Sequence, residues 1–142
     1  MTLKMEPCAP FEAARQMNPL ALAYIGDAVH ALLSRTSRLE KALRLSDMHR
    51  LCTAEVNAQA QCRALQRIQD RLTPEEADIV RRGRNAHPHH SAPHSASSQE
   101  YSAATALEAL YGYLFITGQA GRLQDLFEIG REEEESACPK PD

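Results

Sequence analysis

Two apolar stretches, each with a single acidic residue, constrain this chain more than any other feature. The first runs over Leu20–Leu33 and contains Asp27, and the second runs over Ala103–Phe115 and contains Glu108. An ionised carboxylate in apolar surroundings is costly unless a cation pairs with it or is coordinated by it. A chain with one such acid in each of two apolar helices has to neutralise both, and the way it does so indicates its function.

The composition fits one globular domain that needs no disulfide bonds or metal to fold. The chain has 142 residues, of which 43% are hydrophobic and 25% are charged, which is ordinary for such a domain. No apolar run reaches the roughly 20 residues that span a bilayer, and the first residues lack the long apolar segment of a signal peptide. The four cysteines are scattered, at Cys8, Cys52, Cys62 and Cys138. This favours a reduced cytoplasmic protein without a membrane segment.

Helix-start and helix-stop residues divide the chain into helices only. Asn18 followed by Pro19 begins a helix, Thr73 opens a capping box with Glu76, and Gly118 is a plausible C-cap. No segment alternates as a strand does. We predict an all-α fold of six or seven helices. The main ones cover about 18–33, 47–69, 74–84, 103–115 and 121–134, and residues 34–45 are either a short helix or a linker.

The predicted domain covers residues 18–134, between an N-terminal arm (1–17) and a disordered tail (135–142). A loop rich in His, Ser and Pro interrupts it at residues 86–99. Loops of this length are usually functional or disordered. Its histidines, His87, His89, His90 and His94, could bind a transition metal. The prolines and serines around them instead favour a mobile loop that lies across a bound polyanion.

Charge is unevenly distributed along the chain. The net charge is −3, yet residues 35–84 carry eleven basic and seven acidic side chains, whereas residues 85–142 carry three basic and nine acidic ones. A polyanionic partner would therefore contact the middle of the chain. The alternative is that these side chains form only a solvated basic face.

Glycines accompany both acids, which suggests how the two helices pack. Gly26 precedes Asp27, and Gly112 follows Glu108 by one helical turn. Small residues let two helix backbones approach, so both carboxylates could reach one point, where they would repel each other without a cation. Mg²⁺ binds through one or two carboxylates together with phosphate. The alternative is structural, with Asp27 paired to a basic side chain such as His30 or an arginine and Glu108 facing solvent.

Three motifs, in this order, resemble the ribonuclease III family. They are LALAYIGDA over residues 20–28, RGRNA over residues 82–86 and TALEAL over residues 105–110. They are most similar to the compact members that consist of a catalytic domain without a double-stranded-RNA-binding domain. The resemblance covers about residues 18–128.

The resemblance implies an all-α homodimer that cleaves double-stranded RNA with Mg²⁺. Asp27 matches the catalytic aspartate of the family and Glu108 its essential glutamate, and both would bind the metal. Full-length members carry further acids where this chain has Ala23 and Thr105, which leaves fewer metal ligands. In bacteria the compact members trim precursor 23S ribosomal RNA, with a ribosomal protein as a further possible partner.

Without an accessory domain, the chain must bind RNA through its own surface, mostly by phosphate and 2′-OH contacts. The candidates are Arg81, Arg82, Arg84, Asn85 and His49. The arginines could instead be an exposed basic helix end that favours the helix dipole. Two rival functions remain at this point, namely a non-catalytic RNA-binding or ribosome-associated protein of the same fold, and a helical interaction module in which both acids are structural.

Overall fold

The computed structural model describes residues 9–41, 43–86 and 97–132, and these form seven α-helices and two 3-10 turns with no strand. The prediction of an all-α fold is confirmed. The helices are α1 (Phe11–Arg15), α2 (Pro19–Thr36), α3 (Leu45–Val56), α4 (Ala58–Ile68), α5 (Pro74–Arg84), α6 (Ser98–Ile116) and α7 (Ala120–Gly130). The four loop histidines His87, His89, His90 and His94, with Cys8, Cys138 and the tail, lie outside the described residues.

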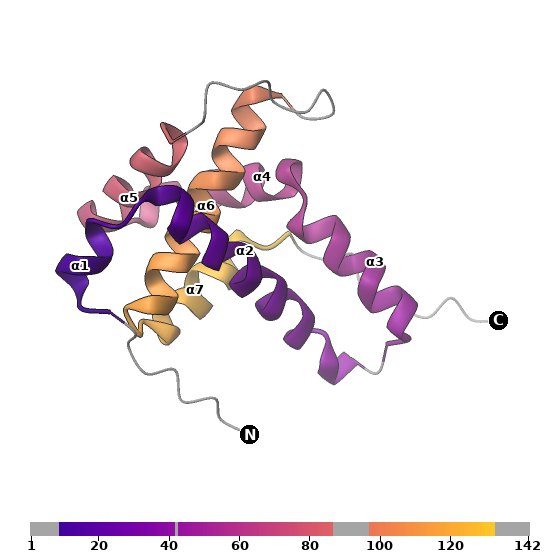
Figure 1. Cartoon of the computed structure of the whole chain (residues 1–142). Coiled ribbons are helices and arrows are strands. Elements are labelled where there is room, and N and C mark those ends of the chain that lie inside the picture. Colours follow the sequence, from indigo (N-terminus) through magenta and orange to yellow (C-terminus); the bar gives the residue numbers. More distant parts are fainter. Residues whose placement is uncertain (1–8, 42, 87–96, 133–142) are drawn as a thin grey trace.

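Helix α6 is the centre of the molecule, and α2, α4, α5 and α7 pack around it (Figure 1). It is apolar on all sides, with Ala106, Leu107, Ala109, Leu110 and Leu114 completely buried. A helix that is hydrophobic all round needs partners on every side. The expectation of a buried helix is therefore confirmed for this second acidic stretch.

Local capping explains several helix boundaries. The side chain of Asn18 accepts a hydrogen bond from the Leu20 amide at the start of α2, and Thr73 with Glu76 forms a reciprocal capping box at the start of α5. Gly118 has a φ of 74° after the end of α6, the left-handed conformation that glycine adopts without strain. These three predicted signals are confirmed.

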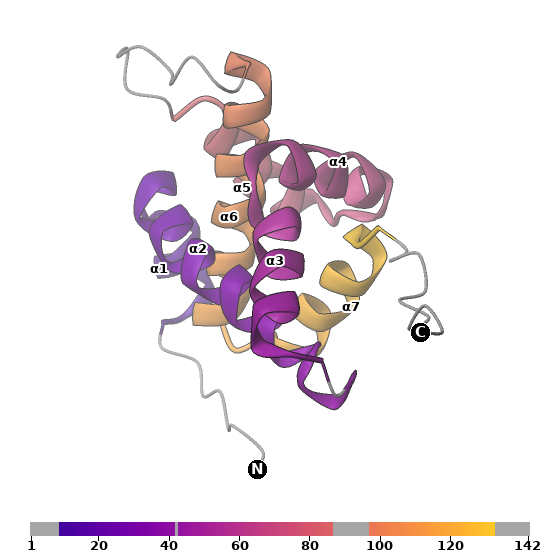
Figure 2. The same cartoon turned by 90° about the vertical axis from the view of Figure 1, so that its right-hand side faces the viewer.

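A single helix over residues 47–69 is the wrong prediction, because the chain turns at Asn57. This residue has an extended backbone, with φ −78° and ψ 162°. Its side chain accepts from the Ala60 amide and donates to the Ala54 carbonyl, so it ends α3 and begins α4 at once. Asparagine competes for backbone hydrogen bonds in this way. Figure 2 shows the two helices meeting at an angle.

The N-terminal segment is not entirely a loose arm, since Phe11–Arg15 forms α1 and Ala14 is buried. Arg82 of α5 donates hydrogen bonds to the carbonyls of Arg15 and Met17. These bonds satisfy carbonyl groups at the end of α1, where no helical partner follows.

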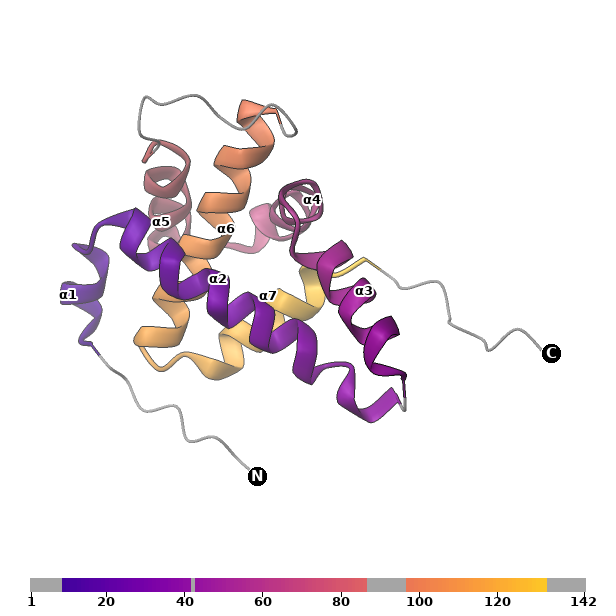
Figure 3. The ribbon, with the colours of Figure 1, turned by 45° about the vertical axis from the view of Figure 1, so that its right-hand side comes forward.

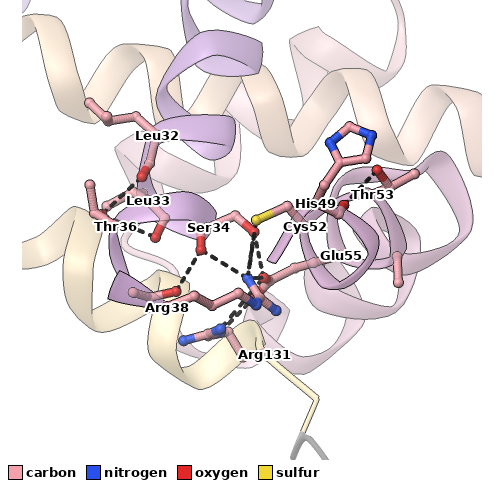
Figure 4. Close-up of polar contacts among 12 residues, drawn as sticks. Leu32, Leu33, Ser34, Thr36, Arg38, His49, Cys52, Thr53, Glu55 and Arg131 are labelled. Carbon is pink, nitrogen blue, oxygen red and sulfur yellow. Dashed lines mark hydrogen bonds and ion pairs between the residues drawn. The ribbon is translucent and has the colours of Figure 1, made fainter. Parts of the chain in front are cut away.

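Residues 34–45 contain the last turn of α2 and a 3-10 turn at Leu39–Lys41. A buried ion cluster anchors this connection (Figure 4). Arg38, only 2% exposed, donates to Glu55 of α3 and to the Ser34 hydroxyl at 2.7 Å. Arg131, after α7, also pairs with Glu55 at 2.7 Å. The cluster ties α2, α3 and the end of α7 together.

None of the described helices is long and apolar enough to cross a membrane. Of the four cysteines, Cys52 and Cys62 lie in the described part and both are free thiols.

Candidate functional site

Helices α2 and α6 cross with their backbones almost in contact (Figure 3). A Cβ atom placed on Gly26 would lie 1.6 Å from the carbonyl oxygen of Glu108, and one on Gly112 would lie 2.0 Å from the carbonyl oxygen of Leu22. Such separations are possible only for glycine. The prediction that these two glycines let the helices approach is confirmed.

This crossing brings the two predicted acids to one place. Gly26 precedes Asp27, and its notch receives the backbone of Glu108 itself. Burial and, after it, the charge of Asp27 raise the pKa of Glu108, as expected where a second carboxylate lies nearby. A pair of acids in this arrangement gains from a cation that neutralises both.

The environments of the two acids differ. Glu108 is half-buried, and burial is the main reason that its pKa rises from 4.5 to about 7, with Asp27 as the second cause. A hydrogen bond from Gln61 acts in the opposite direction. Asp27, by contrast, is exposed. The expectation of apolar surroundings for both acids is wrong for Asp27, because one face of α2 has no partner among the described residues.

The structural alternative for the acids does not hold. Burial lowers the pKa of His30 from 6.5 to about 4, so this side chain is neutral at physiological pH and cannot be the cationic partner of Asp27. Among the described residues, no side chain forms an ion pair with Asp27 or Glu108. Glu108 is also not directed freely into solvent, since it is half-buried beside Gln61.

The two positions at which the resemblance places further acids in full-length enzymes provide no metal ligand. Ala23 is buried in the core. The hydroxyl of Thr105 donates to the carbonyl of Tyr101 in its own helix at 3.1 Å. The described residues contain no cluster of three His, Cys, Asp or Glu side chains that could enclose a metal. A cation here would have two carboxylates and otherwise water or phosphate, a donor set that fits Mg²⁺.

The predicted RNA contacts do not form one group. The guanidinium of Arg82 donates to carbonyls at the end of α1, as described above. Arg81 forms an ion pair of 2.6 Å with Asp78 of its own helix. Gly83 is buried, and a Cβ there would lie 2.8 Å from the Cα of Ala106. Close packing of α5 on α6 therefore requires this glycine.

The remaining candidates lie on two different elements. Arg84, half-buried, and Asn85, exposed, occupy the C-terminal end of α5. His49 is exposed on α3, and its ring points away from the ion cluster (Figure 4). Helix α3 packs on α2 and α4.

Gln61 is a site neighbour that the sequence did not reveal, and it contacts His30, which the sequence offered only as a pairing partner for Asp27. Gln61 is 2% exposed, and its amide lies 3.0 Å from Nδ1 of His30. A lone glutamine carries no recognisable signal of function. The available signal is the position of Gln61 in its helix. In a helix that begins at Ala58, Gln61 lies on the same face as Leu65 and Ile68, which are both completely buried.

The raised pKa of Glu108 predicts a pH-dependent gain in stability for Glu108→Gln. The folded protein keeps this proton up to about pH 7 whereas the unfolded chain releases it near 4.5, so ionisation lowers the free energy of unfolding as the pH rises between these values. In metal-free buffer the variant should match the wild type near pH 4.5. At pH 8 it should be more stable by up to about 3 kcal/mol.

Urea denaturation at several pH values measures this difference, with Glu75→Gln, an exposed glutamate of α5, as the control. The comparison cancels the opposite contribution of His30, which adds stability as the pH rises from about 4 to 6.5 and is present in both proteins. A difference between Glu108→Gln and wild type that stays constant from pH 5 to pH 8 would contradict the prediction.

Comparison with known proteins agrees with this arrangement. Residues 20–119 match the Ribonuclease III domain family. The chain is 46% identical to a protein of Symbiobacterium thermophilum named Mini-ribonuclease 3, over 80% of this chain and 88% of that one. It is 40% identical to a protein of the same name from a Thermoanaerobacter species, over 83% of each chain.

A crystal structure of a protein from Fusobacterium nucleatum has the same fold, with a TM-score of 0.74 and 29% identity over 81% of this chain and 92% of that one. The match to the family spans both acidic helices and the crossing between them. The rival interpretation as a helical interaction module with structural acids is therefore set aside. This chain belongs to the ribonuclease III domain family and is an endoribonuclease of the type that cleaves double-stranded RNA.

Proposed function

We propose that the enzyme depends on Mg²⁺ held by Asp27 and Glu108 and that it matures the ends of precursor 23S ribosomal RNA in the cytoplasm. The observation that carries the metal site is the convergence of the two acids across the Gly26–Gly112 crossing. There the charge of Asp27 and burial keep Glu108 protonated up to about pH 7. The resemblance of the motifs to compact ribonuclease III enzymes supports the choice of substrate.

The side chains of this chain have simple tasks in the reaction. Asp27, exposed, and Glu108, half-buried, provide carboxylate oxygens from two helices whose spacing is set by backbone contact. A bound Mg²⁺ supplies a water activated at neutral pH and stabilises charge at the scissile phosphate. The close crossing fixes the two helix backbones that carry these carboxylates, so little backbone reorganisation is needed during the reaction.

The direct test is an incubation of the purified protein with a structured stem from precursor 23S RNA in Mg²⁺. We expect cleavage at defined positions, none in EDTA, and slower cleavage of an unrelated duplex of equal length. Absence of cleavage over a range of protein and Mg²⁺ concentrations would contradict the proposed function as a whole, and cleavage that persists in EDTA would contradict the proposed metal dependence. Equal cleavage of both duplexes would contradict only the choice of ribosomal RNA.

We also propose that the enzyme is a homodimer, with a second copy covering the open face of α2. On this face Tyr24 is 81% exposed, Leu32 47% and Leu20 39%. Large apolar side chains gathered on one face indicate an interaction site. Two copies joined there would place one pair of acids on each strand of a duplex and so cut both strands.

The variant Tyr24→Arg is therefore expected to be a monomer at concentrations at which the wild type is a dimer. Central aromatic residues often contribute at least about 2 kcal/mol to an interface, or roughly 30-fold in Kd. Light scattering coupled to gel filtration measures the mass. Phe11→Arg, at an aromatic residue of α1 that is 55% exposed, is the matched control. A monomeric wild type at high micromolar concentration would argue against the dimer.

RNA binding is proposed to involve Arg84, Asn85, Arg81 and His49, whereas Arg82 has a structural task. Arg84→Ala should weaken duplex binding at all sequences and reduce the slope of log K against log salt by about one. Arg82→Ala should instead lower the free energy of unfolding by about 1 kcal/mol, because two carbonyls at the end of α1 lose their donor. Filter binding across salt concentrations and urea denaturation separate these effects. An unchanged salt slope for Arg84→Ala would exclude a phosphate contact there.

A further inference from the structure

Beneath the two acids lies a layer of buried rings. His30 follows Asp27 by three residues on α2, and Tyr111 follows Glu108 by three residues on α6, so each acid and its ring lie on one face of the same helix. The two rings meet edge to face with centroids 5.3 Å apart. The ring of Phe127, from α7, contacts His30 from another side at 5.9 Å.

His30 is consequently held in one place. It is 3% exposed, and its contacts with Tyr111 and Phe127 leave the imidazole no free rotation. A buried polar ring still needs a hydrogen-bond partner. That partner is Gln61 of α4, whose Nε2 lies 3.0 Å from Nδ1 of His30. Because an amide nitrogen can only donate, Nδ1 is the acceptor in this pair.

The side-chain amide of Gln61 also extends from this ring layer toward the two acids. A side-chain hydrogen bond from Gln61 is among the causes that set the pKa of Glu108, and it lowers that pKa. An amide NH₂ group has two hydrogens, so one can be directed at the imidazole and the other at the carboxylate. Its 2% exposure means that water does not compete for either bond. Gln61 therefore connects the ring layer to the acid layer, and it comes from a third helix.

We propose that Gln61 is a positioning residue, which the imidazole of His30 holds in place so that its amide fixes the carboxylate of Glu108 in the orientation needed to hold a divalent cation. This inference rests on the proposed metal site. Residues that orient metal ligands from behind typically change metal affinity or activity 10- to 100-fold when they are replaced.

Gln61→Met is the appropriate variant, since it keeps the length and volume of the side chain and removes both donors. Calorimetric titration with Mn²⁺, without RNA, is expected to show affinity about 10- to 100-fold below wild type. In a Glu108→Gln background the same change should have no further effect, because the carboxylate that it positions is gone. Gln66→Met, at an exposed glutamine of the same helix, is the matched control and should bind as wild type does.

A second pair of variants keeps the test informative if Gln61→Met does not fold. His30→Leu removes the acceptor that holds Gln61, whereas His30→Asn places an amide oxygen near the position of Nδ1. We expect His30→Leu to bind Mn²⁺ several-fold more weakly and His30→Asn to restore much of the loss. A purely structural role would lower the melting temperature in either variant without this rescue of Mn²⁺ affinity.

Two results would overturn the inference alone. One is a Gln61→Met protein that binds Mn²⁺ as tightly as the wild type, and the other is an equal loss of affinity in the wild-type and Glu108→Gln backgrounds. If wild-type protein itself does not bind Mn²⁺, the proposed metal site fails and the role of Gln61 fails with it. The wild-type titration therefore distinguishes the two failures.

Discussion

Asp27→Asn is expected to reduce cleavage of duplex RNA by about a thousandfold or more while leaving the fold intact. A catalytic metal contributes several kcal/mol to transition-state stabilisation, and each 1.36 kcal/mol corresponds to a factor of ten in rate. Asp27 is exposed, and the described residues offer its side chain no hydrogen bond or ion pair. Replacing it therefore removes a metal ligand without leaving a buried group unpaired.

Single-turnover cleavage of a labelled stem measures this effect, and circular dichroism with thermal melting verifies the fold. Asp125→Asn, at an exposed acid on α7, serves as the control and should cut at the wild-type rate. Glu108→Gln should lose activity to a similar extent. If Asp27→Asn cuts as fast as the wild type, the assignment of the site to these two acids is wrong.

Among alanine replacements of the described glycines in this chain's helices, Gly26→Ala is expected to cause the largest loss of stability. The new Cβ would lie 1.6 Å from a carbonyl oxygen of α6 and 2.9 Å from the amide nitrogen of Gly112. Both neighbours are backbone atoms, which cannot move aside as a side chain can. Overpacking usually costs 1–3 kcal/mol and occasionally more, so we expect about 3 kcal/mol or more.

Thermal melting should show a decrease of about 10 °C or more, or no cooperative transition at all. Gly121→Ala provides the contrast, because nothing lies within 4 Å of a Cβ at that position in α7. There the change should stabilise the protein by up to about 1 kcal/mol, through the higher helix propensity of alanine. Equal melting temperatures for Gly26→Ala and Gly121→Ala would show that the helices do not cross as described.

The sequence indicated the helical fold and the two halves of the site because those signals are local. Capping at Asn18 and Thr73 depends on residues within one turn, and the glycines adjoin the acids along the chain. The break at Asn57 was missed for a related reason. An asparagine within a helical pattern becomes a double cap only when both flanking helices have other surfaces on which to pack.

Burial, in contrast, could not be predicted from apolar residues alone. Leu20–Leu33 and Ala103–Phe115 look alike in sequence, yet α6 lies at the centre of the molecule whereas α2 leaves Tyr24 and Leu32 exposed. Hydropathy records the preference of a segment and does not identify which of its faces meets a partner. In the proposed dimer that partner for α2 is a second chain.

The amino-acid sequence by itself determined most of the helices, the two acids and the glycine near each of them, because helix propensity, capping and residue identity are local properties. Only the tertiary structure decided that Glu108 is half-buried while Asp27 is exposed, that Arg82 secures α1, and that Gln61 reaches both His30 and Glu108. These facts depend on contacts between residues that are far apart in the chain. The relative placement of α2, α4, α5 and α6 sets those contacts, and no short stretch of sequence specifies it.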